Sequence, residues 1–200
     1  MSLTAAYQQR AQRFSRAEES WGRLDRWLTR LRLVAFCVVV VLLGFGVADD
    51  DGRLWYGSGI LVFTGFLGLI AYHEYVSRQR VIFRILHDLN RQAVARIPRR
   101  WQEFPAPQVA VGAEDQALSY DLDLFGQGSI FQLLCTAATS IGRQTLRDWL
   151  LVPASVEVIR SRQQAVRELT GHLELREALQ LEGRLLTESR CIATHGRTRG

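Results

Sequence analysis

Two apolar segments dominate the pattern of hydrophobic and polar positions along the chain. The first covers residues 31–48 and the second residues 54–72, and only the five residues from Asp49 to Arg53 lie between them. Apart from Arg32 at the start of the first segment, neither contains a charged side chain. About 18 helical residues approach the thickness of the hydrocarbon core of a bilayer. We therefore predict a two-helix transmembrane hairpin over residues 31–72.

A buried pair of core helices and a cleaved signal peptide are the alternatives to this hairpin. A helix at the surface of a soluble protein keeps a polar stripe, whereas the run from Leu33 to Leu43 has no polar position. A signal peptide is disfavoured because the basic lead-in is long and a second apolar segment follows almost at once. The hairpin is the better interpretation.

Arginines flank the hairpin on both sides and predict its orientation. The upstream arginines are Arg16, Arg23, Arg26, Arg30 and Arg32, and the downstream ones begin with Arg78, Arg80, Arg84 and Arg91. The intervening loop holds three aspartates and one arginine. By the positive-inside rule, we expect an inner (plasma) membrane protein with two spans and both termini in the cytoplasm.

The rest of the chain alternates between helical periodicity and short breaks. Residues 1–30 predict a basic amphipathic helix, and residues 73–119 a juxtamembrane helix followed by a linker that contains three of the four prolines. Residues 120–186 predict a helical domain with Ser129 and Ser155 as helix N-caps. Residues 187–200 are small, polar and basic, and we expect an atypical, disordered tail. The predicted fold class is mainly α.

The amino-acid composition excludes several kinds of catalytic and binding site. The chain has 200 residues and a formal charge of +5, and all 25 basic residues are arginine. Without lysine there is no G-x-x-x-x-G-K-[ST] phosphate loop and no Schiff-base lysine. The cysteines Cys37, Cys135 and Cys191 form no C-x-x-C pair, and the four histidines show no metal-ligand spacing. We predict no catalytic, cofactor or metal site in this chain, which is therefore not expected to be an enzyme.

The arginines after the hairpin are the strongest candidates for contact with phosphate. The candidate residues are Arg78, Arg80, Arg84, Arg91, Arg99 and Arg100. Cationic side chains beside a span attract anionic lipid headgroups, and the phosphates of DNA attract the same charges. We favour lipid over DNA for this run.

Two short motifs near residue 125 have both a structural and a chemical interpretation. The Gly126–Ser129 segment resembles a phosphate cradle at a helix N-terminus, but it lacks the glycine spacing and cationic partner of a nucleotide loop. Asp121 and Asp123 could form a metal-binding or catalytic pair, but no third ligand is near. Turn and cap roles are favoured for both.

The helical region carries a family resemblance. The segments YDLDLFGQGSIFQLL (120–134), TSIGR (139–143), LRDWLLVP (146–153) and IRSRQQAVREL (159–169) resemble the start of the core helical domain of MutS-type DNA mismatch repair proteins. With the hairpin, the chain is most similar to the membrane-anchored MutS-like branch. The resemblance covers about 65 residues and implies a partial all-α MutS core-like domain over residues 120–186.

The resemblance implies mismatched-DNA binding and ATP binding, with ATP and Mg as cofactors of full-length family members. It also implies packing and turn roles for Gly128, Ser129, Gly142, Arg143, Trp149 and Pro153. The family's ATPase domain, DNA clamp and aromatic-x-Glu mismatch reader have no counterpart in this sequence. We therefore expect a truncated or frame-shifted version of a longer protein.

Three functions follow as hypotheses. The first is the membrane-anchored N-terminal portion of a MutS-like DNA mismatch repair protein, acting as a homodimer or with a separate partner. The second is a membrane-anchored helical scaffold that binds a protein partner. The third is a basic module that recruits nucleic acid without reading its sequence.

Overall fold

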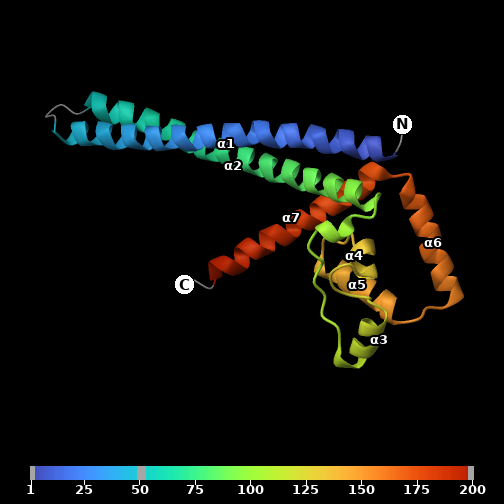
Figure 1. Ribbon diagram of the computed structural model, residues 1–200. Helices are drawn as coiled ribbons and strands as arrows, with labels where there is room; N and C mark the ends of the chain where they lie inside the picture. The colour runs from blue at the N-terminus through green and yellow to red at the C-terminus, as the bar shows by residue number, and fades with distance from the viewer. Residues whose placement is uncertain (1–2, 49–52, 198–200) are drawn as a thin grey trace. The chain divides into compact units, whose positions relative to one another are not determined.

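Every described element of the computed structural model is helical (Figure 1). The structure describes residues 3–48 and 53–197, without the side chains of residues 3, 43, 46–48, 53–56 and 189–197. The elements are α1 (Leu3–Ala48), α2 (Arg53–Arg96), η1 (Trp101–Glu103), η2 (Ala113–Asp115), α3 (Gln116–Asp121), α4 (Ile130–Leu134), α5 (Ser140–Leu151), α6 (Val156–Thr170) and α7 (Leu173–Arg197). The prediction of a mainly α fold is confirmed.

The chain divides into two compact units. One consists of residues 12–84, and the other of residues 1–11 together with residues 85–200. The boundaries of these units do not coincide with the predicted segment boundaries at residues 30 and 72, because α1 continues without a break through residue 30 and α2 through residue 72. We refer to residues 12–84 as the hairpin unit and to the remainder as the helical unit.

In the hairpin unit, α1 and α2 lie side by side (Figure 1) and pack through aromatic side chains. The Trp21 ring lies 6.4 Å from the Phe83 ring and 6.3 Å from the Tyr75 ring, measured between centroids. Leu28 and Val76 are buried beside them, at 3% and 0% exposure. Burial of these side chains holds the charged half of the two helices together.

A polar cluster around Asp25 joins the same two helices. Asp25 accepts hydrogen bonds from the Ser77 hydroxyl at 2.8 Å and from Arg80 Nη1 at 2.9 Å. His73 Nδ1 lies 3.8 Å from Asp25 Oδ1. Because a half-buried carboxylate needs such partners, the cluster fixes the register of α1 against α2.

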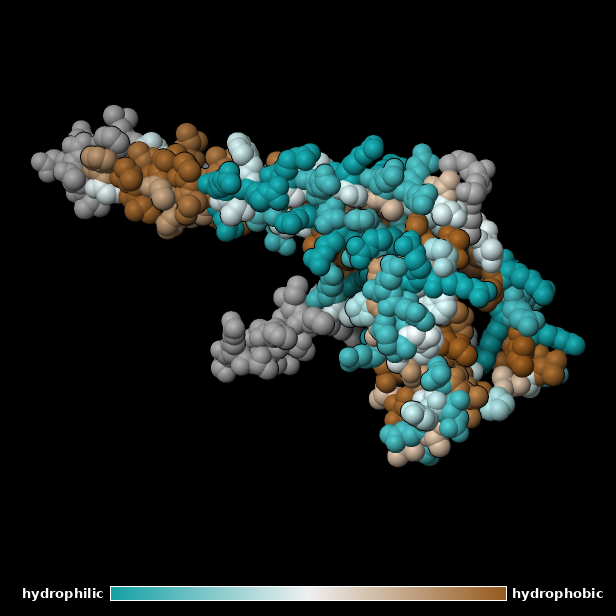
Figure 2. All heavy atoms as spheres, viewed as in Figure 1, coloured by the Kyte–Doolittle hydropathy of each residue, from teal (hydrophilic) through white to brown (hydrophobic). Residues whose placement is uncertain are grey.

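The far half of the hairpin unit exposes many large apolar side chains, which cover the face that Figure 2 shows. Leu33, Phe36, Ile60 and Leu61 are 66%, 54%, 68% and 74% exposed. The described part of α2, Gly57–Arg96, contains an 18-residue window of mean hydropathy 1.4, of which 11% is buried. This one described helix is therefore long and apolar enough to cross a membrane.

The predicted first span and the loop are described only in part. The side chains of residues 43 and 46–48 lie outside the described residues, as does the whole acidic turn, Asp49–Gly52. A span over residues 31–48, and with it the two-span topology and the orientation of the termini, stays a prediction.

The core of the helical unit centres on the short helix α4. Phe131 is fully buried and lies 5.2 Å from the Phe125 ring, between centroids. Gln132 is 2% exposed, and its Nε2 donates to the carbonyl oxygens of Trp101 and Phe104 at 3.2 and 2.6 Å. Its Oε1 accepts from the Gly128 N–H at 2.7 Å. One satisfied buried amide thus attaches η1 to α4.

The turn before α4 requires its glycines. Gly126 and Gly128 have φ values of 101° and 83°, which residues other than glycine rarely adopt. Ser129 then caps the helix, because its hydroxyl accepts from the Gln132 N–H at 3.1 Å and donates to the Gly126 carbonyl at 2.8 Å. This cap was predicted from the sequence, as was Ser155 at the start of α6.

Two expectations about the helical unit were wrong. Helix α3 occupies residues 116–121, whereas the sequence predicted a linker that continues to residue 119. Helix α7 continues to Arg197, whereas residues 187–200 were expected to be a disordered tail. No proline interrupts residues 187–197, and the Thr187 hydroxyl donates to the carbonyls of Gly183 and Ala138, so the helix extends past residue 186.

Candidate functional site

Three of the arginines predicted to contact phosphate are engaged within the protein. Arg80 pairs with Asp25, and Arg100 Nη1 lies 3.5 Å from Glu103 Oε1. The Arg91 guanidinium lies 5.3 Å from the centre of the Phe104 ring. Because these side chains already interact within the protein, they are less free to bind lipid headgroups or DNA phosphates.

The other three predicted phosphate contacts, Arg78, Arg84 and Arg99, are exposed. Arg78 and Arg84 belong to α2 in the hairpin unit, whereas Arg99 lies just after α2 in the helical unit, with φ of 60°. The six arginines therefore do not form one continuous surface on a single unit.

Of the residues that the MutS resemblance assigns to packing and turns, some make close internal contacts and others are exposed. Gly142 packs closely, since an added Cβ would lie 3.0 Å from the Ala137 Cβ. Arg143 Nη1 donates to the Ala138 carbonyl at 3.0 Å. Together with the Gly128–Ser129 turn, these residues order the segments on either side of α4.

Trp149 and Pro153 lie further out. Trp149 is 49% exposed, and its ring is covered by the Arg162 guanidinium at 3.9 Å from its centre. The expected aromatic anchor is therefore a cation–π contact at the surface between α5 and α6. Pro153 is exposed just beyond the end of α5 and cannot continue that helix.

The Gly126–Ser129 segment has no free cradle of N–H groups. Gly128 N–H is bound by Gln132 Oε1, and the Ser129 hydroxyl is used in the cap. Asp121 and Asp123 are both exposed, and among the described residues no three His, Cys, Asp or Glu side chains form a group that could hold a metal ion. The contacts of the Gly126–Ser129 segment are those of a turn and a cap, whereas the turn and cap roles of Asp121 and Asp123 stay a prediction.

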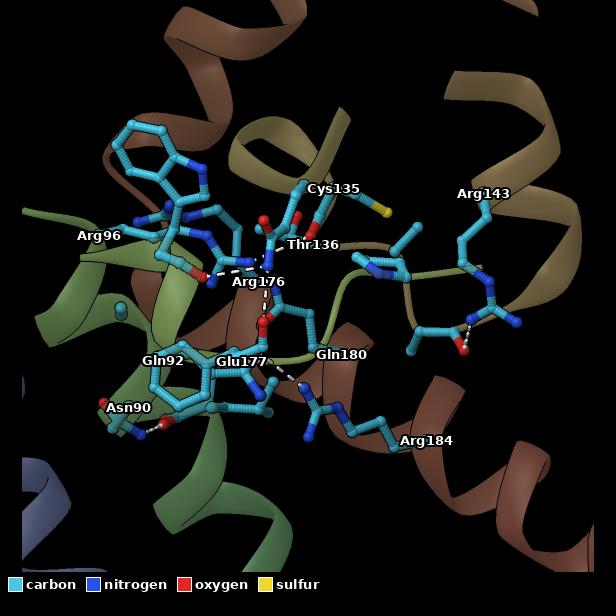
Figure 3. Close-up of a pocket in the computed structure, with 18 of the residues that line it drawn as sticks. Asn90, Gln92, Arg96, Cys135, Thr136, Arg143, Arg176, Glu177, Gln180 and Arg184 are labelled. Carbon is cyan, nitrogen blue, oxygen red and sulfur yellow. Dashed lines mark hydrogen bonds between the residues drawn. The ribbon is translucent and has the colours of Figure 1, made fainter. Parts of the chain in front are cut away.

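The helical unit contains a cavity of about 560 Å³ that the sequence did not indicate (Figure 3). The end of α2, η1, the segment between α4 and α5, and α7 contribute to its walls. Its apolar wall includes Leu89, Ile97, Trp101 and Phe104. A volume of this size and a mixed apolar and polar lining are typical of sites for small molecules.

Four arginines line this cavity: Arg96, Arg143, Arg176 and Arg184. Arg96 donates to the carbonyls of Leu133 and Cys135 at 3.3 and 3.2 Å, and Arg184 donates to Gln92 Oε1 at 3.3 Å. Arg176 Nη2 lies 3.5 Å from the Thr170 carbonyl. Within this unit, no carboxylate of the described residues lies within 4.0 Å of these four guanidinium groups.

Two carboxylates also line the cavity. Glu177 accepts from Arg10 Nη1 at 2.8 Å and from Asn90 Nδ2 at 2.5 Å, so its charge is already matched. Glu188 is exposed near the described end of α7. The cavity thus has an excess of positive charge.

Burial acts on the ionisable groups of this wall. Burial is the largest cause of the lowered pKa of Arg96. The Cys135 group raises this pKa, and the positive charge of Arg184 lowers it further. Burial likewise lowers the pKa of Arg184, while Asp88 and Glu188 oppose the shift. Burial raises the pKa of the Cys135 thiol. Both arginines remain protonated at neutral pH, and their charges act on each other.

One sequence pattern coincides with this cavity, although by itself it does not indicate a cavity. Arg176, Gln180 and Arg184 recur every four residues along α7 and line the same wall. Such a stripe is usually the solvated face of a helix. Only the packing of α7 against distant segments, such as Gly183 near Ala138, turns it inward.

In comparisons with known proteins, no family model, curated protein or solved structure matches the chain.

Proposed function

We propose that the protein is a membrane-anchored, MutS-like helical protein that crosses the membrane twice and carries its helical unit on the cytoplasmic side. In this proposal the far half of the α1–α2 pair is the anchor. The arginines before and after it keep both termini in the cytoplasm.

The observation that carries the membrane part of the proposal is the exposure of an uninterrupted apolar surface. Large side chains of both helices, such as Phe36, Leu61 and Phe63, face outward at 54%, 74% and 48% exposure. Water would disfavour a surface of this kind, whereas lipid would bury it.

The link to DNA mismatch repair depends on the residue pattern of segment 120–169. The segments that carry the resemblance include α4, α5 and α6, and the side chains of Ser129, Thr139 and Ser155 cap the starts of these helices. ATP binding would belong to a separate part of a full-length family member, because a phosphate loop of the G-x-x-x-x-G-K-[ST] type needs a lysine.

Duplex binding by the full chain in neutral-lipid nanodiscs tests the link to DNA. Fluorescent duplexes with and without one mismatch are titrated at several salt concentrations. The proposal expects binding at low salt that is tighter for the mismatched duplex and weakens as salt rises. Equal binding of both duplexes would favour a module that recruits nucleic acid non-specifically. Absence of binding at low salt would contradict any direct role on DNA.

A scaffold for a protein partner is the second candidate function. Exposed apolar side chains on α5, α6 and α7 favour it: Ile141, Val166 and Leu179 are 73%, 65% and 61% exposed. Co-purification of a stoichiometric partner, lost on substitution of these residues by serine, would support this function over direct DNA binding.

A further inference from the structure

We propose that the cavity of the helical unit is a binding site for an organic phosphate, held by Arg96, Arg184 and the arginines beside them. The ligand would have a phosphate or diphosphate group on an apolar body. This inference goes beyond the proposed function and does not depend on it.

The first argument is the state of the four guanidinium groups. The acceptors of their hydrogen bonds are neutral: the carbonyls of Leu133, Cys135, Ala138 and Thr170, and the amide of Gln92. The carboxylates nearby do not balance these charges, because Glu177 is already paired with Arg10 and Glu188 is exposed. An excess of positive charge is unfavourable, particularly where burial removes water. A bound dianion would reverse this cost, and the planar fork of arginine matches phosphate oxygens.

Unused donors in the same wall are the second argument. Trp101 Nε1 and Arg176 Nε are buried, and neither has a hydrogen-bond partner among the described residues. Both residues line the cavity. A buried N–H without an acceptor costs free energy, so a small rearrangement around an entering oxyanion would satisfy donors that are now unpaired.

The apolar part of the wall suggests the rest of the ligand. Besides the arginines, the lining includes the apolar side chains of Phe104, Pro105 and Pro107 and the indole of Trp101. A cavity of about 560 Å³ exceeds the need of a free phosphate ion, which leaves room for an organic group.

The test uses the full chain in nanodiscs of neutral lipid, with inorganic pyrophosphate as the probe at constant ionic strength. Calorimetry is expected to show saturable binding of one pyrophosphate per chain. Arg184→Gln should weaken binding about tenfold, because it removes charge-assisted hydrogen bonds. Arg160→Gln is the matched control: it removes one positive charge from the exposed face of α6 and should change the affinity less than twofold.

A second arm distinguishes a soluble ligand from a lipid headgroup. The titration is repeated in nanodiscs that contain phosphatidic acid. Unchanged pyrophosphate affinity would assign a soluble organic phosphate, whereas competition by the lipid would assign the headgroup; both outcomes support the site.

Two results would overturn the proposal: absence of saturable pyrophosphate binding to the unaltered chain, or equal loss of affinity in Arg184→Gln and Arg160→Gln. If Arg184→Gln proves unfolded by circular dichroism, hydrogen exchange of the unaltered chain decides instead. Pyrophosphate should then slow exchange in α7 around residues 176–184, and unchanged exchange there would contradict the site.

Discussion

Exposed apolar side chains occur in both units, and the comparison between them shows that exposure alone does not identify a membrane anchor. Leu61 of the hairpin unit is 74% exposed, and Ile141 of the helical unit is 73% exposed. Residues 54–72 around Leu61, however, contain no charge, whereas Arg143, Arg147 and Asp148 interrupt α5, the helix of Ile141. A continuous apolar surface suits lipid, while an amphipathic one suits a protein partner.

The packing of the two units differs as well. Long helices joined by aromatic rings and the Asp25 cluster make up the hairpin unit. In the helical unit, short elements depend on a single buried amide, Gln132, and on the caps around it. The two units should therefore respond separately to substitution.

The largest effect is expected from a charge placed in the apolar surface. Leu61→Arg should lower the membrane-inserted fraction, because an arginine near the centre of a spanning helix costs about 2.5–3.5 kcal/mol. Val166→Arg on α6 is the matched change in the other unit and should leave the inserted fraction unchanged. Alkaline carbonate extraction measures both. An equal inserted fraction for the two variants would contradict the proposed difference between the two units.

Loss of the buried amide should destabilise only the helical unit. Gln132→Leu keeps the size of the side chain but leaves the Trp101 and Phe104 carbonyls and the Gly128 N–H without their partner. We expect a loss of about 2–3 kcal/mol in the free energy of unfolding. Denaturant titration followed by hydrogen exchange of α4 measures it. Gln164→Leu on the exposed face of α6 is the control and should change little.

The two serine caps offer a smaller, internal comparison. Ser129 is buried and makes two hydrogen bonds, whereas Ser155 is exposed and accepts from the Val158 N–H at 3.5 Å. Ser129→Ala should cost about 1–2 kcal/mol and Ser155→Ala about 0.5 kcal/mol. Thermal unfolding monitored by circular dichroism would rank them, and the reverse order would contradict the burial argument.

A small effect, in the range of the serine caps, is expected at the Asp25 cluster. Asp25→Asn keeps an acceptor for Ser77 but loses the charge that pairs with Arg80. Because Arg80 is 43% exposed, screening by water limits the expected loss to about 1 kcal/mol. Hydrogen exchange should increase around residues 21–28 and 73–80 only. Glu19→Gln, on an exposed position of α1, is the matched control.

Local signals in the sequence were sufficient for the helices and several of their ends. The serine caps, the glycine turn before α4 and the break at Pro153 all depend on residues near one another in the chain. The length of the uncharged apolar segments predicted two spanning helices, and one described helix, α2, is long and apolar enough to span a membrane. The end of α7 was missed, because weak helix formers extend a helix once its first turns are packed.

Contacts between distant residues could not be predicted. The spacing of Arg80 suggested a phosphate contact, but Asp25, 55 positions away, is its partner. The cavity depends on four separate segments, and no motif within one of them identifies it. Arg143 was noted only through a family resemblance, while Arg176 and Arg184 resembled a solvated helix face.

Site-specific labelling of the full chain tests the central claim, a twice-spanning anchor with a cytoplasmic helical unit. Single cysteines are introduced as Gln9→Cys, Asp50→Cys and Arg160→Cys in a chain whose own cysteines are replaced by serine. A membrane-impermeant maleimide should label Asp50→Cys in intact cells, and the other two only after lysis. Labelling of Gln9→Cys or Arg160→Cys in intact cells, or of Asp50→Cys only after lysis, would contradict the account.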